Sequence, residues 1–231
     1  GEIYVADSWN HRVRKLTPVM AAPVQVEPLI AIRVVHAASL VTGPIAPGQL
    51  VTILGAGLGT ALSLADAQVL FDGTPTPVLS VQDDQIQVQA PYGIARQTAT
   101  VIEVQVRQSP RGRVSTPVTA AAPGLFTLAQ GKGPALAVNE DGTLNTDQNP
   151  AARGSAVVLY ATGEGVSKLP VAVSVGGFPA EVVFAGAASG FPGLMQVNLR
   201  LPSASMPSGV LPLTLTVGTI TSQPGVTLAV N

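Results

Sequence analysis

The feature that most constrains this chain is an internal repeat. Four segments recur in the same order, with the two copies about 105 residues apart. The pairs are residues 46–59 with 152–165, 69–78 with 173–182, 85–91 with 196–202, and 115–118 with 222–226. In the first pair, each copy has a turn glycine, a short apolar run and a closing Gly-x-Gly. Because order and spacing are both kept, the repeat predicts two homologous units of about 100 residues each.

Short apolar runs between glycines and prolines indicate β-structure. The 231 residues include 24 Gly and 20 Pro, and 46% of the chain is hydrophobic. Residues 85–89 and 196–200 alternate with a period of two, and no run keeps a helical period for long. About seven short strands fit into each repeat unit, as in an immunoglobulin-like domain. We therefore predict an all-β fold of two tandem immunoglobulin-like β-sandwiches with an extended N-terminal β arm.

The charge balance excludes several classes of protein. Only 11% of the residues are charged, the net charge is -1, and there is no Cys. Without a basic excess nucleic-acid binding is disfavoured, and without Cys there is neither a disulfide framework nor a thiolate metal site. The longest apolar stretch, residues 19–41, is broken by Pro23, Glu27, Pro28 and Arg33, which predicts no membrane span. Low charge with many Thr, Val, Gly and Pro favours an extracellular or cell-surface location, as in secreted bacterial β-proteins.

Residues 1–36 lie outside the repeat and are predicted to form the arm. Residues 3–5 and 12–16 are strand-like and flank the turn-forming residues 7–10, which indicates a β-hairpin followed by an extended strand. The predicted division is 1–36 for the arm, 37–128 for the first unit and 129–231 for the second. The arm residues expected to pair with another sheet are Ile3, Tyr4, Val5, Val13, Leu16, Val24, Val26, Ile30, Ile32 and Val34.

Several motifs resemble known families. Residues 47–59, with Pro-Gly, an apolar strand and a Gly-x-Gly-Leu-Gly close, resemble the IPT/TIG type of bacterial immunoglobulin-like domain. The whole of residues 37–231 is similar to an uncharacterised C-terminal domain of large secreted proteins of acidobacteria. Its motifs here are residues 84–91, 122–126, 139–145, 149–150, 161–163 and 196–198. Residues 4–7 and 10–14 resemble part of an NHL propeller repeat. The resemblance implies fold and location and no established enzymatic activity.

The titratable residues do not form a catalytic pattern. His11 and His36 are the only histidines, and no nucleophile motif accompanies either of them. The carboxylate pairs at 83–84 and 140–141 are sequence neighbours, which point to opposite faces of a strand or cap turns. We therefore predict that the chain is not an enzyme and needs no cofactor.

Two loops offer weaker candidate sites. Asn139, Asp141, Asn145 and Asp147 place oxygen atoms at alternate positions, as calcium prefers, but the EF-hand pattern fails, so a plain turn is favoured over a metal site. Phe178 and Phe191 lie in Gly/Pro-rich loops and are the best candidates for an exposed ligand-binding pair, although core or loop packing is the favoured role for both.

These sequence features suggest two functions of different classes. The first is a structural or interaction module that forms a homo-oligomer or polymer by strand addition of the arm, as in a fibre, stalk or surface layer. The alternative is an adhesion module that binds a polysaccharide or another cell-surface ligand.

Overall fold

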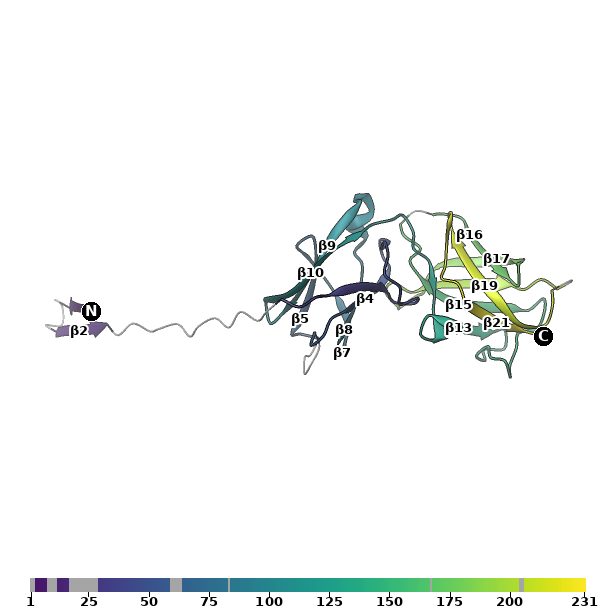
Figure 1. The fold of residues 1–231 in the computed structure, drawn as a ribbon, viewed down its shortest axis with the longest axis horizontal. Helices are drawn as coiled ribbons and strands as arrows, with labels where there is room; N and C mark the ends of the chain where they lie inside the picture. Colours follow the sequence, from purple (N-terminus) through teal and green to yellow (C-terminus); the bar gives the residue numbers. More distant parts are fainter. Residues whose placement is uncertain are drawn as a thin grey trace.

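The chain folds into two β-sandwiches in tandem. The computed structural model describes residues 3–7, 12–16, 29–58, 64–82, 84–166, 168–203 and 206–231. Over these residues the protein is all-β, and the predicted fold class is confirmed (Figure 1). The helix in this part of the chain is one 3-10 turn, η1 (Tyr92–Arg96). Within the described ranges, no helix has the length and apolar character needed to cross a bilayer.

The N-terminal sandwich consists of strands β3 to β10. These are β3 Arg33–His36, β4 Leu50–Leu54, β5 Ala67–Phe71, β6 Thr74–Thr76, β7 Val78–Gln82, β8 Gln85–Gln89, β9 Ala99–Val106 and β10 Ser109–Pro117. One sheet has the order β3-β4-β8-β7 and the other β10-β9-β5-β6. Their inner faces bury one apolar core, in which Ile53, Phe71 and Ile102 are among the largest side chains.

The C-terminal sandwich consists of strands β11 to β21. These are β11 Gly124–Leu125, β12 Thr127–Ala129, β13 Lys132–Ala135, β14 Ala137–Asn139, β15 Ala156–Thr162, β16 Val171–Val175, β17 Phe178–Ala187, β18 Met195–Arg200, β19 Gly209–Val217, β20 Ile220–Thr221 and β21 Val226–Val230. The long strand β17 pairs with β16 in its first half and with β18 in its second half, so it joins the two layers. A bulge between Val182 and Phe184 interrupts its register with β18.

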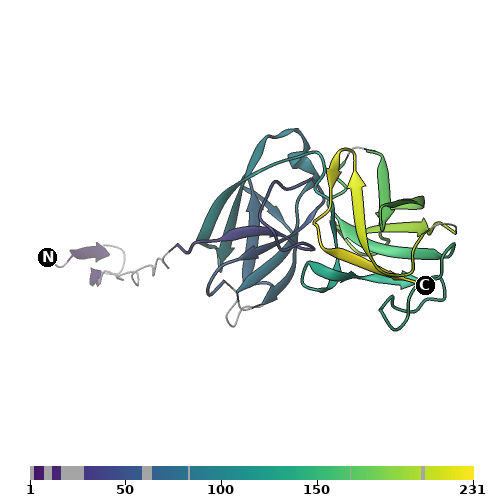
Figure 2. The same ribbon diagram turned by 45° about the vertical axis from the view of Figure 1, so that its right-hand side comes forward.

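The repeated segments occupy equivalent places in the two sandwiches. β4 pairs antiparallel with β8, and β15 pairs in the same way with β18. β5 and β6 form a hairpin, as do β16 and the start of β17. The alternating runs of β8 and β18 behave as predicted, since their apolar residues Ile86, Val88, Val197 and Leu199 are all fully buried. Figure 2 shows the two sandwiches packed directly against each other.

The predicted arm divides into two parts. β1 (Ile3–Asp7) and β2 (Arg12–Leu16) form the expected antiparallel hairpin, and among the described strands they pair only with each other. Val24 and Val26 lie outside the described residues. Val34 is buried in the N-terminal core, and Ile30 and Ile32 pack against that core. These three side chains therefore complete their own sandwich, because the chain runs from the edge of β10 into β3, where it pairs with β4.

Candidate functional site

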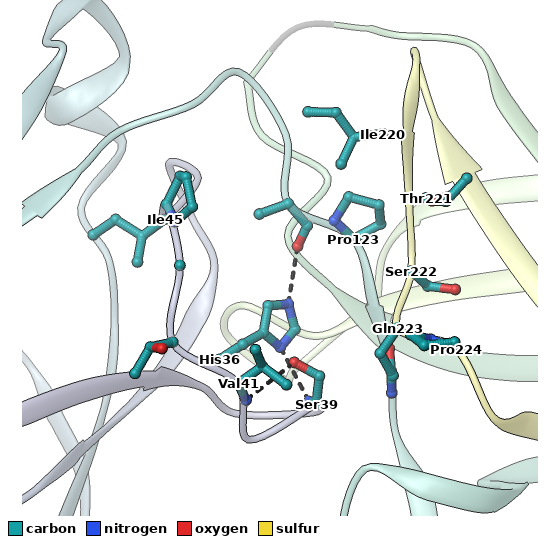
Figure 3. Close-up of a pocket in the computed structure, with 14 residues that line it drawn as sticks. His36, Ser39, Val41, Ile45, Pro123, Ile220, Thr221, Ser222, Gln223 and Pro224 are labelled. Atoms are coloured by element: carbon teal, nitrogen blue, oxygen red, sulfur yellow. Dashed lines mark hydrogen bonds between the residues drawn. The ribbon is translucent and has the colours of Figure 1, made fainter.

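The junction between the sandwiches brings together chemically distinctive groups. His36, at the end of β3, donates an Nε2–H hydrogen bond to the carbonyl of Ala122 at 2.9 Å (Figure 3). Its Nδ1 faces the backbone N–H groups of Ala38 and Ser39, at 3.1 and 3.3 Å. Two donors pointing at Nδ1 require a neutral ring with its proton on Nε2. Burial lowers the pKa of His36 below its ordinary value, which favours the same neutral form.

A pocket of about 400 Å³ lies beside this histidine. Its walls come from the loop after β3, the segment before β11, and the turn from β20 to β21. Among the residues that the structure describes, no Asp, Glu, Lys or Arg lines it. The side-chain amide of Gln223 is paired with the backbone of Leu125, and the Ser222 hydroxyl accepts the N–H of Leu215. These two polar groups are therefore engaged in holding the backbone of the C-terminal sandwich.

A buried threonine forms the second contact of the junction. Thr162, at the end of β15, accepts the N–H of Leu50 at 2.8 Å and donates to the carbonyl of Gly193 at 2.6 Å. One hydroxyl therefore hydrogen-bonds to the backbone N–H of the first residue of β4 in one sandwich and to a loop carbonyl of the other. Thr162 is completely buried and Leu50 is buried, so the N–H of Leu50 has no water as a substitute partner.

Glycines of the C-terminal sandwich let the two backbones approach closely. A Cβ at Gly124 would lie 2.1 Å from Cε1 of His36, and one at Gly131 would lie 2.6 Å from the carbonyl oxygen of Ser39. A Cβ at Gly193 would lie 2.8 Å from Cγ of Leu50. Any side chain at these three positions would push the sandwiches apart. The junction is thus close-packed at several separated points.

Sequence reasoning did not identify this junction, although its motifs were visible. Residues 122–126 and 161–163 were singled out by resemblance, and they contribute Ala122, Gly124 and Thr162 to it. For His36 the sequence shows only that no nucleophile motif accompanies it. No single-residue signal shows that these segments meet, because the contacts join positions that are far apart in the chain.

The loop with the weak candidate calcium ligands is held by its own hydrogen bonds. The Asn145 amide is buried, donating to Asn139 Oδ1 at 3.0 Å and to the carbonyl of Ala229 at 2.9 Å, while its Oδ1 accepts the Ala229 N–H at 3.0 Å. Asp141 Oδ1 accepts the N–H and the hydroxyl of Thr143, and these bonds lower the pKa of the Asp141 carboxyl. Asp147 is exposed. The Asn145 amide therefore fastens the loop to Ala229 of β21 through both its nitrogen and its oxygen, and Asn139 Oδ1 holds that amide in place.

The two predicted loop aromatics differ in exposure. Phe178 is partly buried and packs against the C-terminal core. Phe191 is 65% exposed, in the loop between β17 and β18. The structure therefore does not bring them into one exposed pair.

Comparison with known proteins agrees with the architecture. Residues 34–121 match the IPT/TIG domain. This stretch runs from the second residue of β3 to beyond the end of β10, and IPT/TIG domains are typically non-catalytic. No curated protein matches the chain.

Solved structures with similarity to the chain share little sequence with it. The full extracellular region of plexin A4 is 18% identical with a TM-score of 0.34, covering 93% of this chain and 20% of that one. The I9–I11 tandem from titin is 11% identical with a TM-score of 0.26, covering 86% and 65%. SGBP-B of Bacteroides ovatus, in complex with a mixed-linkage heptasaccharide, is 13% identical with a TM-score of 0.30, covering 94% and 46%. The chain thus spans a fifth of the plexin structure.

Replacing Thr162 by Val should destabilise the protein by about 2–4 kcal/mol, because the buried N–H of Leu50 and the partly buried carbonyl of Gly193 both lose their partner. Chemical denaturation measures the change. Thr216→Val on β19, a partly buried threonine for which the structure shows no side-chain hydrogen bond, is the matched control and should change stability by less than about 1 kcal/mol. Equal effects of the two variants would contradict the bridging role of Thr162.

His36 should make stability fall on acidification. Its folded-state pKa lies below the ordinary value of 6.5, so its contribution is complete above that value and is lost as pH falls toward the folded-state pKa. The melting temperature, followed by calorimetry from neutral to mildly acidic pH, should fall more steeply for the wild type than for His36→Gln. Parallel curves would show that the neutral ring does not support the junction.

Asn145→Leu should cost on the order of 3 kcal/mol, because the buried N–H and carbonyl of Ala229 lose their partner. Asp147→Ala, in the same loop but exposed, is the control and should stay within about 0.5 kcal/mol. A melting temperature that rises with added calcium in the wild type and not in Asn145→Leu would contradict the purely structural role.

Proposed function

We propose that this chain is a non-enzymatic, extracellular structural and interaction module of a secreted bacterial surface protein. In this proposal its copies associate when the N-terminal hairpin of one copy adds to a sheet of the next, giving a fibre, a stalk or a surface layer. The single observation that carries it is the hairpin β1–β2. Among the described strands it pairs with no third strand, and a two-stranded hairpin alone is at best marginally stable in water.

The hairpin has enough chain to reach another molecule. Leu16 ends β2, and Leu29 is the first described residue of the N-terminal sandwich. The intervening chain can span at most about 45 Å when fully extended. A head-to-tail contact made through such a tether does not close on itself, so it continues into a filament.

Strand β7 is the favoured acceptor edge. The edge strand β10 contains Arg111, Arg113 and two prolines, while β6 and β12 have three residues each and β6 contains a proline. Charges, prolines and shortness all block strand addition. β7, with the sequence VLSVQ, is five residues long and uncharged and lies at the edge of its sheet, with a bulge between Val78 and Ser80 as its one protective feature. It matches β1 and β2 in length.

The rigid junction suits a load-bearing or spacing role. Thr162 and the three close-packed glycines hold one sandwich against the other. A force on one sandwich is therefore transmitted to the other, and the two sandwiches keep their relative orientation. A chain with 11% charged residues also has little charge repulsion to keep copies apart.

Deletion of residues 1–28 should abolish assembly and leave both sandwiches folded, because Ile30, Ile32 and Val34 remain to complete the first core. Multi-angle light scattering and electron microscopy of the full chain at high concentration give the size of the assemblies. The deleted form retains an acceptor and lacks a donor, so an excess of it should shorten assemblies of the full chain. A full chain that stays monomeric, or assemblies that persist after deletion, would overturn the proposal.

A further inference from the structure

One outer face of the C-terminal sandwich carries an unusual set of side chains. Strands β15, β18 and β17 lie next to one another, and their register defines two cross-strand rows. One row is Val158, Asn198 and Phe184, and the other is Tyr160, Gln196 and Gly186. The alternate residues Leu159 and Val197 are fully buried in the core, so these two rows point outward.

Two aromatic residues flank this face. Phe184, on β17, is 46% exposed, and its ring extends along its own strand toward Gly186. A Cβ at Gly186 would lie 3.3 Å from Cζ of Phe184. Because Gly186 has no side chain, the Phe184 ring can lie over it. Tyr160, partly exposed on β15, lies two strands away, a separation of about 10 Å. Among the described residues its hydroxyl has no hydrogen-bond partner in the protein.

The space between the aromatics is occupied by two amides. Gln196 Nε2 donates to Asn198 Oδ1 at 2.7 Å. This bond fixes both amides and leaves Gln196 Oε1 free to accept and Asn198 Nδ2 free to donate. A neighbouring acceptor and donor match two adjacent hydroxyl groups of a ligand.

The face is neutral and bounded at both ends. Neither row contains a charged residue, and the next row outward pairs Arg200 with Glu181, of opposite charge. At the other end Thr162 is buried under Leu50 of the N-terminal sandwich. The junction therefore closes one end of the face, and the two rows themselves offer a ligand uncharged groups.

We propose that this face, formed by Tyr160, Phe184, Gln196 and Asn198, binds an uncharged polysaccharide. The aromatic rings offer apolar surfaces to the C–H faces of sugar rings, while the amides and the Tyr160 hydroxyl bind sugar hydroxyls. An added peptide strand fits less well, because β18 and the second half of β17 lie inside the sheet and their backbone groups are already paired. The proposal is independent of the hairpin and of assembly.

Native affinity electrophoresis through gels containing hydroxyethyl cellulose, laminarin or galactomannan tests this site. At least one of these neutral polymers should retard the folded chain, and carboxymethyl cellulose, an anionic polymer, should retard it less. Phe184→Ala should weaken binding about tenfold, the effect of losing one aromatic contact. Gln196→Ala should weaken it in the same direction, with melting temperatures confirming that both variants fold.

Phe191→Ala is the matched control, because Phe191 is even more exposed and lies in a loop outside the two rows. It should bind as the wild type does, and so should the form lacking residues 1–28. No retardation by any of the neutral polymers would overturn the proposal. So would unchanged binding by Phe184→Ala, an equal loss in Phe191→Ala, or stronger retardation by carboxymethyl cellulose.

Discussion

The arrangement of this molecule depends on the hydroxyl group of Thr162. It binds the N–H of Leu50 and the carbonyl of Gly193, so a single buried atom joins β4 of one sandwich to a loop of the other. Burial makes the bond to Leu50 obligatory, since water cannot replace it. Gly124, Gly131 and Gly193 surround this link with contacts that tolerate no Cβ. Two sandwiches that could have been joined flexibly are instead locked in one orientation.

This orientation shapes both surfaces on which function is proposed. It closes one end of the aromatic–amide face, and it creates the uncharged pocket beside His36. It also leaves β7 at the free edge of its sheet, in the N-terminal sandwich. Assembly through the hairpin and sugar binding on the sheet face use different parts of the molecule, so one chain can do both at once.

Sequence reasoning succeeded where the physical signal is local. The period-two runs correctly predicted strands β8 and β18, and the strand-like runs on either side of a turn correctly predicted the hairpin β1–β2. It did not anticipate the 3-10 turn η1, and it assigned Ile30, Ile32 and Val34 to a free arm. A strand that completes its own sandwich and one that is offered to a neighbour share the same alternation, so pattern alone does not separate them. The division at residues 37–128 and 129–231 stays a prediction, although Ala121 and Leu125 already lie in the second core.

By itself, the sequence determined that this protein is all-β and contains two homologous units. Glycine and proline spacing and alternation are properties of neighbouring residues, and the ordered repeat is visible when the chain is compared with itself, so none of them depends on a long-range contact. Only the tertiary structure decided that Thr162 meets Leu50, 112 residues away, and that Phe184, Gln196 and Tyr160 share one face. Strand register and close packing set these contacts, and both arise from the whole fold rather than from any single segment.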